Sequence, residues 1–244
     1  MAAVCACASC STHYQLTGIE RTRILIDSRY DATIDTETAR FLKPYTMQVD
    51  SLMSPVVGQT ARYLAPARPE GLLSNLMPDI LMWSASKFGE TPDFAVYNLG
   101  GIRAALPEGD ITMEDIVNIA PFDNKICFLS LTGDKVKELF SQMVKRGGEC
   151  VSHGVRVQMS RDRRLLSVTV NGKKIDEQRT YRIVTLDYVS QGNDGMVAFK
   201  SKTNIVSPQN VESSVRFLTI EYFKAIAKAG KKVDSQLEGR FAVE

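Results

Sequence analysis

Apolar residues recur along this chain in short blocks whose spacing changes repeatedly between that of a strand and that of a helix. Alternating or short continuous apolar runs predict strands; these lie at residues 21–27, 56–63, 94–97, 126–131, 155–159, 166–170 and 181–185. Stripes at i, i+3, i+4 spacing predict helices; these lie at residues 69–81, 112–119, 133–143 and 215–226, and residues 36–54 share the helical spacing. Strands and helices mixed without regular β-α-β alternation indicate an α+β fold or a layered sandwich.

Two short motifs predict where elements begin and turn. Thr112, followed three residues later by Asp115, is typical of a helix N-terminus with a capping box. Asn171-Gly172 predicts a two-residue hairpin turn. Residues 1–20 carry no element and are interpreted as a signal-like or disordered tail, and residues 21–244 as a single domain.

Composition narrows the class of protein. The chain has 244 residues, of which 44% are hydrophobic and 24% charged, as in an ordinary globular protein. Its net charge is +2, and the basic residues are scattered. Nucleic-acid binding needs a continuous basic patch, so no nucleic-acid partner is expected. No apolar run is long enough to cross a bilayer.

Histidine is scarce, which bears on metal chemistry. Only His13 and His153 are present, with no H-x-H, D-x-H or H-E-x-x-H motif. A two-metal hydrolytic site takes most of its ligands from His, Asp and Glu. The sequence therefore predicts no catalytic transition-metal site in this chain, although counting residues leaves an all-carboxylate magnesium site open.

The N-terminus is rich in cysteine, at Cys5, Cys7 and Cys10. A metal-binding tract would need a second cysteine or histidine pair, which is missing. Ala8-Ser9 before Cys10 resembles the end of a bacterial lipoprotein signal, although a basic n-region is lacking. This motif predicts a lipid anchor at Cys10 and an extracytoplasmic, periplasmic or membrane-anchored location. A tail without function is the alternative.

The first candidate for chemistry is the segment from Asn98 to Arg103. Gly100 and Gly101 follow an apolar strand closely and allow a sharp turn or a close backbone approach. The guanidinium of Arg103 suits a phosphate group, and the amide of Asn98 offers both a donor and an acceptor. An ordinary strand-to-turn connection with a solvent-facing arginine explains the motif about equally well.

Two further segments carry aromatic and acidic residues. Phe122 follows a predicted helix, where it either belongs to the core or stands free to stack on a planar ligand. Tyr188 ends a predicted strand, and the turn after it presents Asp194, whose carboxylate suits a pair of vicinal hydroxyls. Taken separately, a core phenylalanine and an ordinary Asn-Asp-Gly turn are the simpler interpretations.

Together these motifs resemble the C-terminal domain of the 5′-nucleotidase family. The resemblance rests on five segments in order, NLGGIR at 98–103, EGDIT at 108–112, APFDN at 120–124, LTG at 131–133 and YVSQGNDG at 188–195. It implies a layered α/β/β/α sandwich with mixed sheets. It also implies that Phe122 and Tyr188 sandwich a base, Asp194 holds the ribose hydroxyls, and Arg103 with Asn98 reaches the phosphate. The substrate-binding set would be Asn98, Gly100, Gly101, Arg103, Phe122, Asn124, Tyr188, Gly192, Asn193 and Asp194.

The sequence departs from the family pattern in several places. Tyr188 stands where the family usually has phenylalanine. Asn193 replaces a glycine and is therefore expected to adopt a backbone angle usually given to glycine. His153 lies in a segment that is glycine-rich in the family, and its role is open. Lys87 is a stand-in for a further phosphate-binding arginine that the family has.

In this family a separate domain carries two metal ions, and no such domain is recognisable here. The resemblance therefore implies a nucleotide- or nucleoside-binding chain that holds no cofactor itself and is inactive alone. A separate metallophosphoesterase subunit would bring divalent metals and complete the active site for nucleotide catabolism. A non-catalytic nucleoside-binding lipoprotein is the alternative.

Overall fold

The computed structural model describes residues 14–30 and 35–244. By internal contacts the chain divides into two units, Met1–Thr46 and Met47–Glu244. The first unit contains the 3-10 turn η1 (Ser28–Tyr30) and the start of helix α1. Helix α1 covers Thr36–Met53 and has no buried residue. The single domain proposed for residues 21–244 stays a prediction.

The strand predicted over residues 21–27 is wrong. These residues have no regular structure, and Ile24 and Ile26 are exposed. Among the described residues, no strand pairs with residues 21–27. A strand without a neighbour has neither a hydrogen-bonded ladder nor a core to face.

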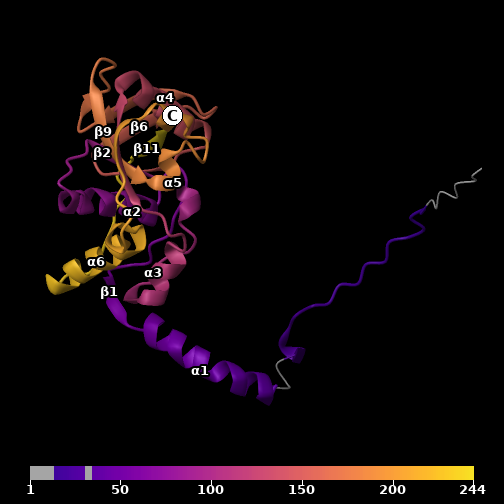
Figure 1. The fold of residues 1–244 in the computed structure, drawn as a ribbon. Helices are drawn as coiled ribbons and strands as arrows, with labels where there is room; N and C mark the ends of the chain where they lie inside the picture. Colours follow the sequence, from indigo (N-terminus) through magenta and orange to yellow (C-terminus); the bar gives the residue numbers. More distant parts are fainter. Residues whose placement is uncertain (1–13, 31–34) are drawn as a thin grey trace, which may run out of the picture. The chain divides into compact units, whose positions relative to one another are not determined.

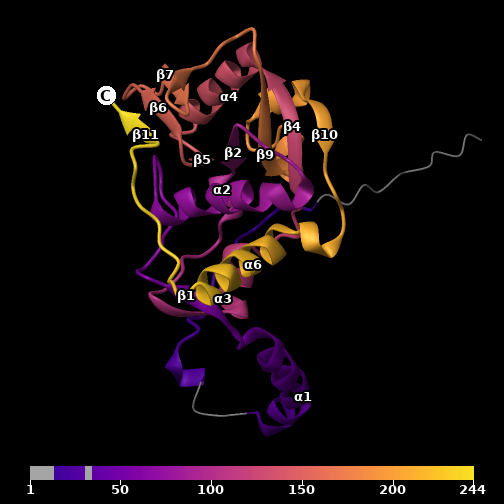
Figure 2. The same cartoon turned by 90° about the vertical axis from the view of Figure 1, so that its left-hand side faces the viewer.

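Three sheets form the frame of the second unit (Figures 1 and 2). The largest has five strands in the order β10 (Thr203–Val206), β4 (Ile126–Thr132), β9 (Thr180–Leu186), β2 (Phe94–Tyr97) and β5 (Cys150–Val151). The second has the order β11 (Phe241–Val243), β6 (Val155–Met159), β7 (Leu165–Val170) and β8 (Lys173–Lys174), and the third pairs β1 (Val56–Thr60) with β3 (Gly109–Thr112). Both larger sheets are mixed, since β2 runs parallel to β9 and β11 runs parallel to β6.

Helices cover these sheets. They are α2 (Leu72–Ser84), α3 (Met113–Ile119), α4 (Gly133–Lys145), α5 (Asp187–Ser190) and α6 (Val215–Lys228), with 3-10 turns η2 (Ala85–Phe88), η3 (Leu99–Gly101), η4 (Val197–Ser201) and η5 (Val211–Ser213). Helix α2 packs on β2 and β5, α4 contacts strands of both larger sheets, and α6 packs on β1 and α2 (Figure 2). The predicted α+β sandwich with mixed sheets is confirmed. None of the helices in the described part of the chain is both long and apolar enough to cross a membrane.

The local motifs behave as predicted. Thr112 caps α3 through a complete capping box with Asp115, in which each side chain bonds the other residue's backbone N–H. Asn171 and Gly172 join β7 to β8 with φ angles of 50° and 75°, the positive values that a type I′ hairpin turn needs. The helix expected from Pro69 begins instead at Leu72.

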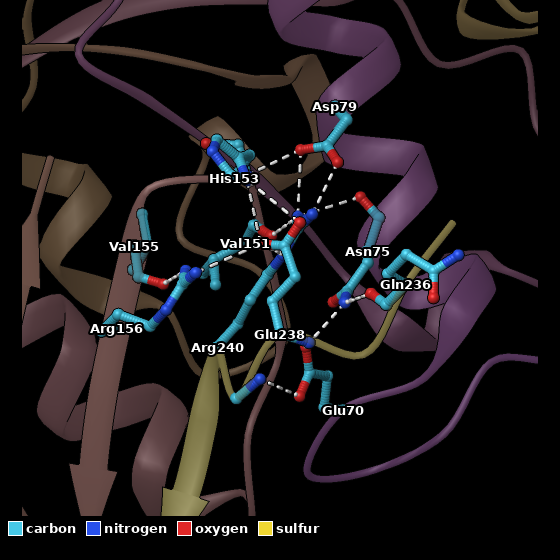
Figure 3. Close-up of polar contacts among 12 residues, drawn as sticks. Glu70, Asn75, Asp79, Val151, His153, Val155, Arg156, Gln236, Glu238 and Arg240 are labelled. Atoms are coloured by element: carbon cyan, nitrogen blue, oxygen red, sulfur yellow. Dashed lines mark hydrogen bonds and ion pairs between the residues drawn. The ribbon is translucent and has the colours of Figure 1, made fainter. Parts of the chain in front are cut away.

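Arg240 fastens the C-terminal segment to α2 and β5 (Figure 3). Only 1% of this residue is exposed. Its guanidinium donates to both carboxylate oxygens of Asp79, at 2.9 and 2.6 Å, and to the carbonyl of Val151 at 2.6 Å. His153, whose role was open, joins the same cluster, since its backbone N–H bonds Asp79 and its ring contacts Glu238 at 3.0 Å. His153 is thus placed in a structural network.

This network predicts a contribution to stability that depends on pH. Partial burial alone raises the pKa of Glu238, but the hydrogen bond from His153 and the charge of Arg240 outweigh it and hold that pKa below its usual value of 4.5. A carboxylate with a lowered pKa stabilises the fold above its unfolded pKa, and this contribution is lost as pH falls through the folded value. We expect the stability difference between wild type and Glu238→Gln to shrink from roughly pH 5 to pH 3. Urea midpoints across that range measure it, and a constant difference would contradict the assignment.

Candidate functional site

Three loops meet at one edge of the five-stranded sheet, and the strand order explains why. Strand β2 is parallel to β9, so the segments that follow them leave the sheet at the same edge. Strand β4 is antiparallel to β9, with Ile126 opposite Leu186, so the segment before β4 reaches that edge as well. The loops are residues 98–103, 120–125 and 187–195.

The first loop turns sharply after the fully buried strand β2. Asn98 precedes the 3-10 turn η3, and its carbonyl accepts a hydrogen bond from the N–H of Gly101 at 3.0 Å. A Cβ atom on Gly101 would lie 2.7 Å from Oδ1 of Asn98. Glycine at this position therefore makes room for the Asn98 side chain. Arg103 ends the loop with an exposed side chain whose Nη1 donates to the carbonyl of Gly100 at 3.3 Å.

The second loop holds the Phe122 ring away from the core, with 48% of the residue exposed. Arg216 of α6 fixes this loop by donating to the carbonyls of Ala120 and Pro121 at 3.2 and 2.8 Å. The guanidinium carbon of Arg103 lies 6.0 Å from the centroid of the Phe122 ring, within reach of a cation–π contact. Phe122 is thus not a core residue.

The third loop carries Tyr188, 40% exposed, in the short helix α5. The residues after it form a tight turn in which the Asn193 side chain donates to the carbonyl of Tyr188 at 2.8 Å. The left-handed residues of this turn are Gly192, Asp194 and Gly195, with φ of 86°, 52° and 73°. The expectation for Asn193 is therefore wrong. The left-handed angle falls on Asp194, one residue after Asn193. Aspartate tolerates this angle better than most residues.

Asn98 links the first loop to the third. Its side chain is almost fully buried, and Nδ2 donates to Oδ2 of Asp194 at 2.6 Å. Its Oδ1 is buried and has no hydrogen-bond partner among the described residues. A carboxylate only accepts hydrogen bonds, so the end of the Asn98 amide that faces Asp194 is the NH2 group. The other end, which has no partner, is therefore the oxygen Oδ1.

A pocket of about 350 Å³ lies between the three loops. Seven of the ten predicted site residues line it: Asn98, Gly100, Arg103, Phe122, Asn124, Tyr188 and Asp194. Gly101, Gly192 and Asn193 do not line it and instead shape the backbone around it. The pocket has two half-exposed rings, a carboxylate and a guanidinium on its walls. Such a set can stack on a planar group and bind polar groups at its rim.

Lys87 does not reach this pocket. It lies in the turn η2 directly after α2, over the ring of Trp83 at 5.1 Å, and forms an ion pair with Glu221 of α6. The suggestion that it replaces a phosphate-binding arginine is therefore wrong. Spacing along the chain does not indicate that α6 packs beside this lysine.

One residue behind the pocket was not identified from the sequence. The side chain of Glu149 is fully buried, and its Oε2 accepts the N–H of Leu99 in the first loop at 2.7 Å. Its Oε1 accepts Arg146 at 2.8 Å and also binds Arg68. Arg146 in turn lies beside Gly195 of the third loop. A lone glutamate after two glycines carries no recognisable motif, so only the fold shows this support.

Metal ligands are not gathered in this part of the protein. Within residues 14–30 and 35–244, no three His, Cys, Asp or Glu side chains come together as ligands of an ion. Cys127 and Cys150 are buried free thiols, and burial raises both of their pKa values. The donor set of the described residues does not fit a two-metal hydrolytic centre.

Comparison with known proteins identifies the family. Residues 56–201 match the family described as "5′-nucleotidase, C-terminal domain". The chain is 30% identical to the trifunctional nucleotide phosphoesterase protein YfkN of Bacillus subtilis over 183 residues, 69% of this chain and 12% of that protein. It is 28% identical to the cell wall protein Lmo0130 of Listeria monocytogenes over 186 residues, 70% of this chain and 23% of that protein. The chain belongs to the 5′-nucleotidase C-terminal domain family.

A solved structure agrees with this assignment. The 5′-nucleotidase precursor from Thermus thermophilus superposes with a TM-score of 0.75 and 26% identity, covering 88% of this chain and 44% of that one. The chain thus spans less than half the length of each of these relatives.

Proposed function

We propose that this protein binds a nucleotide or nucleoside and serves as the substrate-recognition part of a 5′-nucleotidase-type phosphoesterase. The observation that carries the proposal is the pocket itself, where Phe122 and Tyr188, 66 positions apart in sequence, line one cavity with Asp194 and Arg103. Membership of the family supports it, since the relatives include proteins named 5′-nucleotidase and nucleotide phosphoesterase.

Each side chain has a role that its chemistry suits. The rings of Phe122 and Tyr188 stack on the base, a contact worth about 1–3 kcal/mol per ring. Asp194 accepts hydrogen bonds from the ribose hydroxyls while Asn98 steadies its carboxylate. The unpartnered Oδ1 of Asn98 gains a donor from the ligand, which removes the cost of a buried lone acceptor. Arg103 reaches the phosphate end.

Hydrolysis itself is assigned to a metal-bearing partner. The proposal assigns the divalent ions to a separate metallophosphoesterase chain or domain, and the lack of a metal-ligand cluster among the described residues supports it. That partner would generate the nucleophile and stabilise the phosphoryl transition state. This chain would contribute positioning of the substrate, which is a large part of catalysis.

An extracytoplasmic location is part of the proposal. One relative is named a cell wall protein, and the predicted anchor residue Cys10 lies outside the described residues. Periplasmic release or lipid anchorage would both place the domain where nucleotides arrive from outside the cell.

The purified chain is expected to bind adenosine or AMP and to hydrolyse neither. Calorimetric titration measures binding, and phosphate release with added Mn²⁺, Mg²⁺ or Zn²⁺ measures hydrolysis. Metal-dependent AMP hydrolysis by the pure chain would overturn the assignment of the metals to a partner. Co-purification with a metallophosphoesterase supports the two-part enzyme, whereas nucleoside binding without any such partner supports a non-catalytic binding lipoprotein.

A further inference from the structure

A second cavity, of about 260 Å³, is lined by four arginines. Arg68 precedes α2, Arg146 ends α4, and Arg161 with Arg163 lies in the turn between β6 and β7. Three separate segments of the chain thus bring guanidinium groups to one hollow. Nothing in the proposed nucleotide pocket requires the last two.

Glu149 balances only part of this charge. Its single buried carboxylate binds both Arg68 and Arg146. Arg68 is held further by its Nε, which donates to the carbonyl of Gly148 at 2.8 Å. Two arginines fixed on one carboxylate retain a net positive charge, and their remaining N–H groups stay available to an anion.

The other two arginines have no carboxylate partner. Across residues 14–30 and 35–244, no ion pair joins Arg161 or Arg163 to an acidic side chain. The acidic residue between them, Asp162, binds Arg164 at 2.7 Å and accepts a hydrogen bond from the hydroxyl of Ser160. The backbone N–H of Arg161 donates to the main-chain oxygen of Glu244 at 3.2 Å, a contact that does not involve the guanidinium of Arg161.

Two of these side chains lie on either side of Gly147, which also lines the hollow. A Cβ atom there would lie 3.7 Å from Cδ of Arg68 and 3.8 Å from Nη2 of Arg163. Arg68 and Arg163 therefore approach the same glycine from different segments. Guanidinium groups that line one hollow repel one another, and an anion bound there would offset that repulsion.

Helix capping alone does not explain the cluster. Arg163 donates to the carbonyl of Lys145 at the end of α4, at 3.4 Å, and the C-terminus of a helix favours cations. The partial charge there is about half an elementary charge, however, which one guanidinium more than balances. Of the other three arginines, Arg68 and Arg146 share Glu149, and Arg161 forms no ion pair with an acidic side chain of the described residues.

We propose that Arg68, Arg146, Arg161 and Arg163 form a second anion-binding site, which takes a phosphate or diphosphate group. Planar guanidinium forks suit phosphate oxygens, and several converging arginines favour a multiply charged group over a single carboxylate. The group belongs either to a free anion or to a further phosphate on a nucleotide in the first pocket. Arg146 connects the two sites, since its Cδ would lie 3.6 Å from a Cβ on Gly195, the residue after Asp194.

Titration of the full chain with inorganic diphosphate tests this site. Arg161→Gln combined with Arg163→Asn removes two charges, and asparagine suits the left-handed φ of 61° at residue 163. We expect this double variant to weaken diphosphate binding about tenfold or more. A matched control, Lys224→Gln with Lys228→Gln, removes two exposed positive charges from α6 and should change the affinity by less than about twofold. Failure of the wild type to saturate, or equal losses in both double variants, overturns the proposal.

ADP separates the two sources, because it keeps both ribose hydroxyls for Asp194 and carries a second phosphate. If its affinity falls in both the arginine double variant and Phe122→Ala/Tyr188→Ala, the occupant is a second phosphate of the bound nucleotide. If only diphosphate is weakened by the arginine variant, the occupant is a free anion. Loss of base stacking alone would leave diphosphate binding unchanged, so failure of the nucleotide pocket and failure of the arginine site give different results.

Discussion

Replacing Phe122 and Tyr188 together with alanine is expected to weaken adenosine binding by about 30-fold or more. Each ring should contribute about 1–3 kcal/mol of stacking, and every 1.4 kcal/mol is roughly a factor of ten in affinity. Both side chains are 40–48% exposed, so their loss creates no core cavity and should barely change the free energy of unfolding. Calorimetric titration measures the affinity, and thermal unfolding without ligand measures stability.

Two controls separate stacking from other effects. Tyr188→Phe keeps the ring and removes only the hydroxyl, so it should retain most of the affinity. Phe41→Ala with Tyr45→Ala removes two exposed rings from α1 that do not line the pocket. Unchanged adenosine affinity in the Phe122/Tyr188 variant, or an equal loss in the α1 variant, would contradict the role assigned to the two rings.

The resemblance to the family singled out the three candidate segments, and the structure shows that these segments have constrained backbones. Gly101 leaves room for the Asn98 amide, and Gly192 and Gly195 allow a left-handed turn around Asp194. The sequence alone could not show that the loops meet. That depends on β9 lying between β2 and β4, an order set by pairing across the whole domain.

The failed predictions share a physical cause. The strand expected at residues 21–27 had the right alternation but no partner, and a pattern cannot show whether a second strand is present. Lys87 was assigned a wrong role, and Glu149 was overlooked, because their partners are distant in sequence. Glu221 lies 134 positions from Lys87, and Leu99 lies 50 positions from Glu149. Charge partners at such separations are a product of the fold.

Arg240 and Asp79 are a charge pair whose members lie 161 positions apart in sequence. Replacing Arg240 is expected to have the largest effect on stability. Arg240→Met would remove a buried guanidinium that donates to the carbonyl of Val151 and to the carboxylate of Asp79, whose side chain is 30% exposed. Breaking a fully buried ion pair on one side costs about 3–5 kcal/mol, and the partial exposure of Asp79 places the expected loss at the lower end of that range. That is a large share of the roughly 5–15 kcal/mol by which folded domains are stable. Urea unfolding should therefore show a markedly lower midpoint with an unchanged slope.

Arg156→Met is the matched control, because Arg156 also contacts Glu238, at 3.4 Å, but keeps 40% of its side chain exposed (Figure 3). An exposed pair of this kind is worth about 0–1 kcal/mol. Adding Asp79→Leu to Arg240→Met should recover part of the loss, since the remaining unpaired carboxylate would be gone. Equal destabilisation by the two single variants would show that Arg240 acts through packing of its alkyl chain and that its charge is not what holds the C-terminal segment on α2.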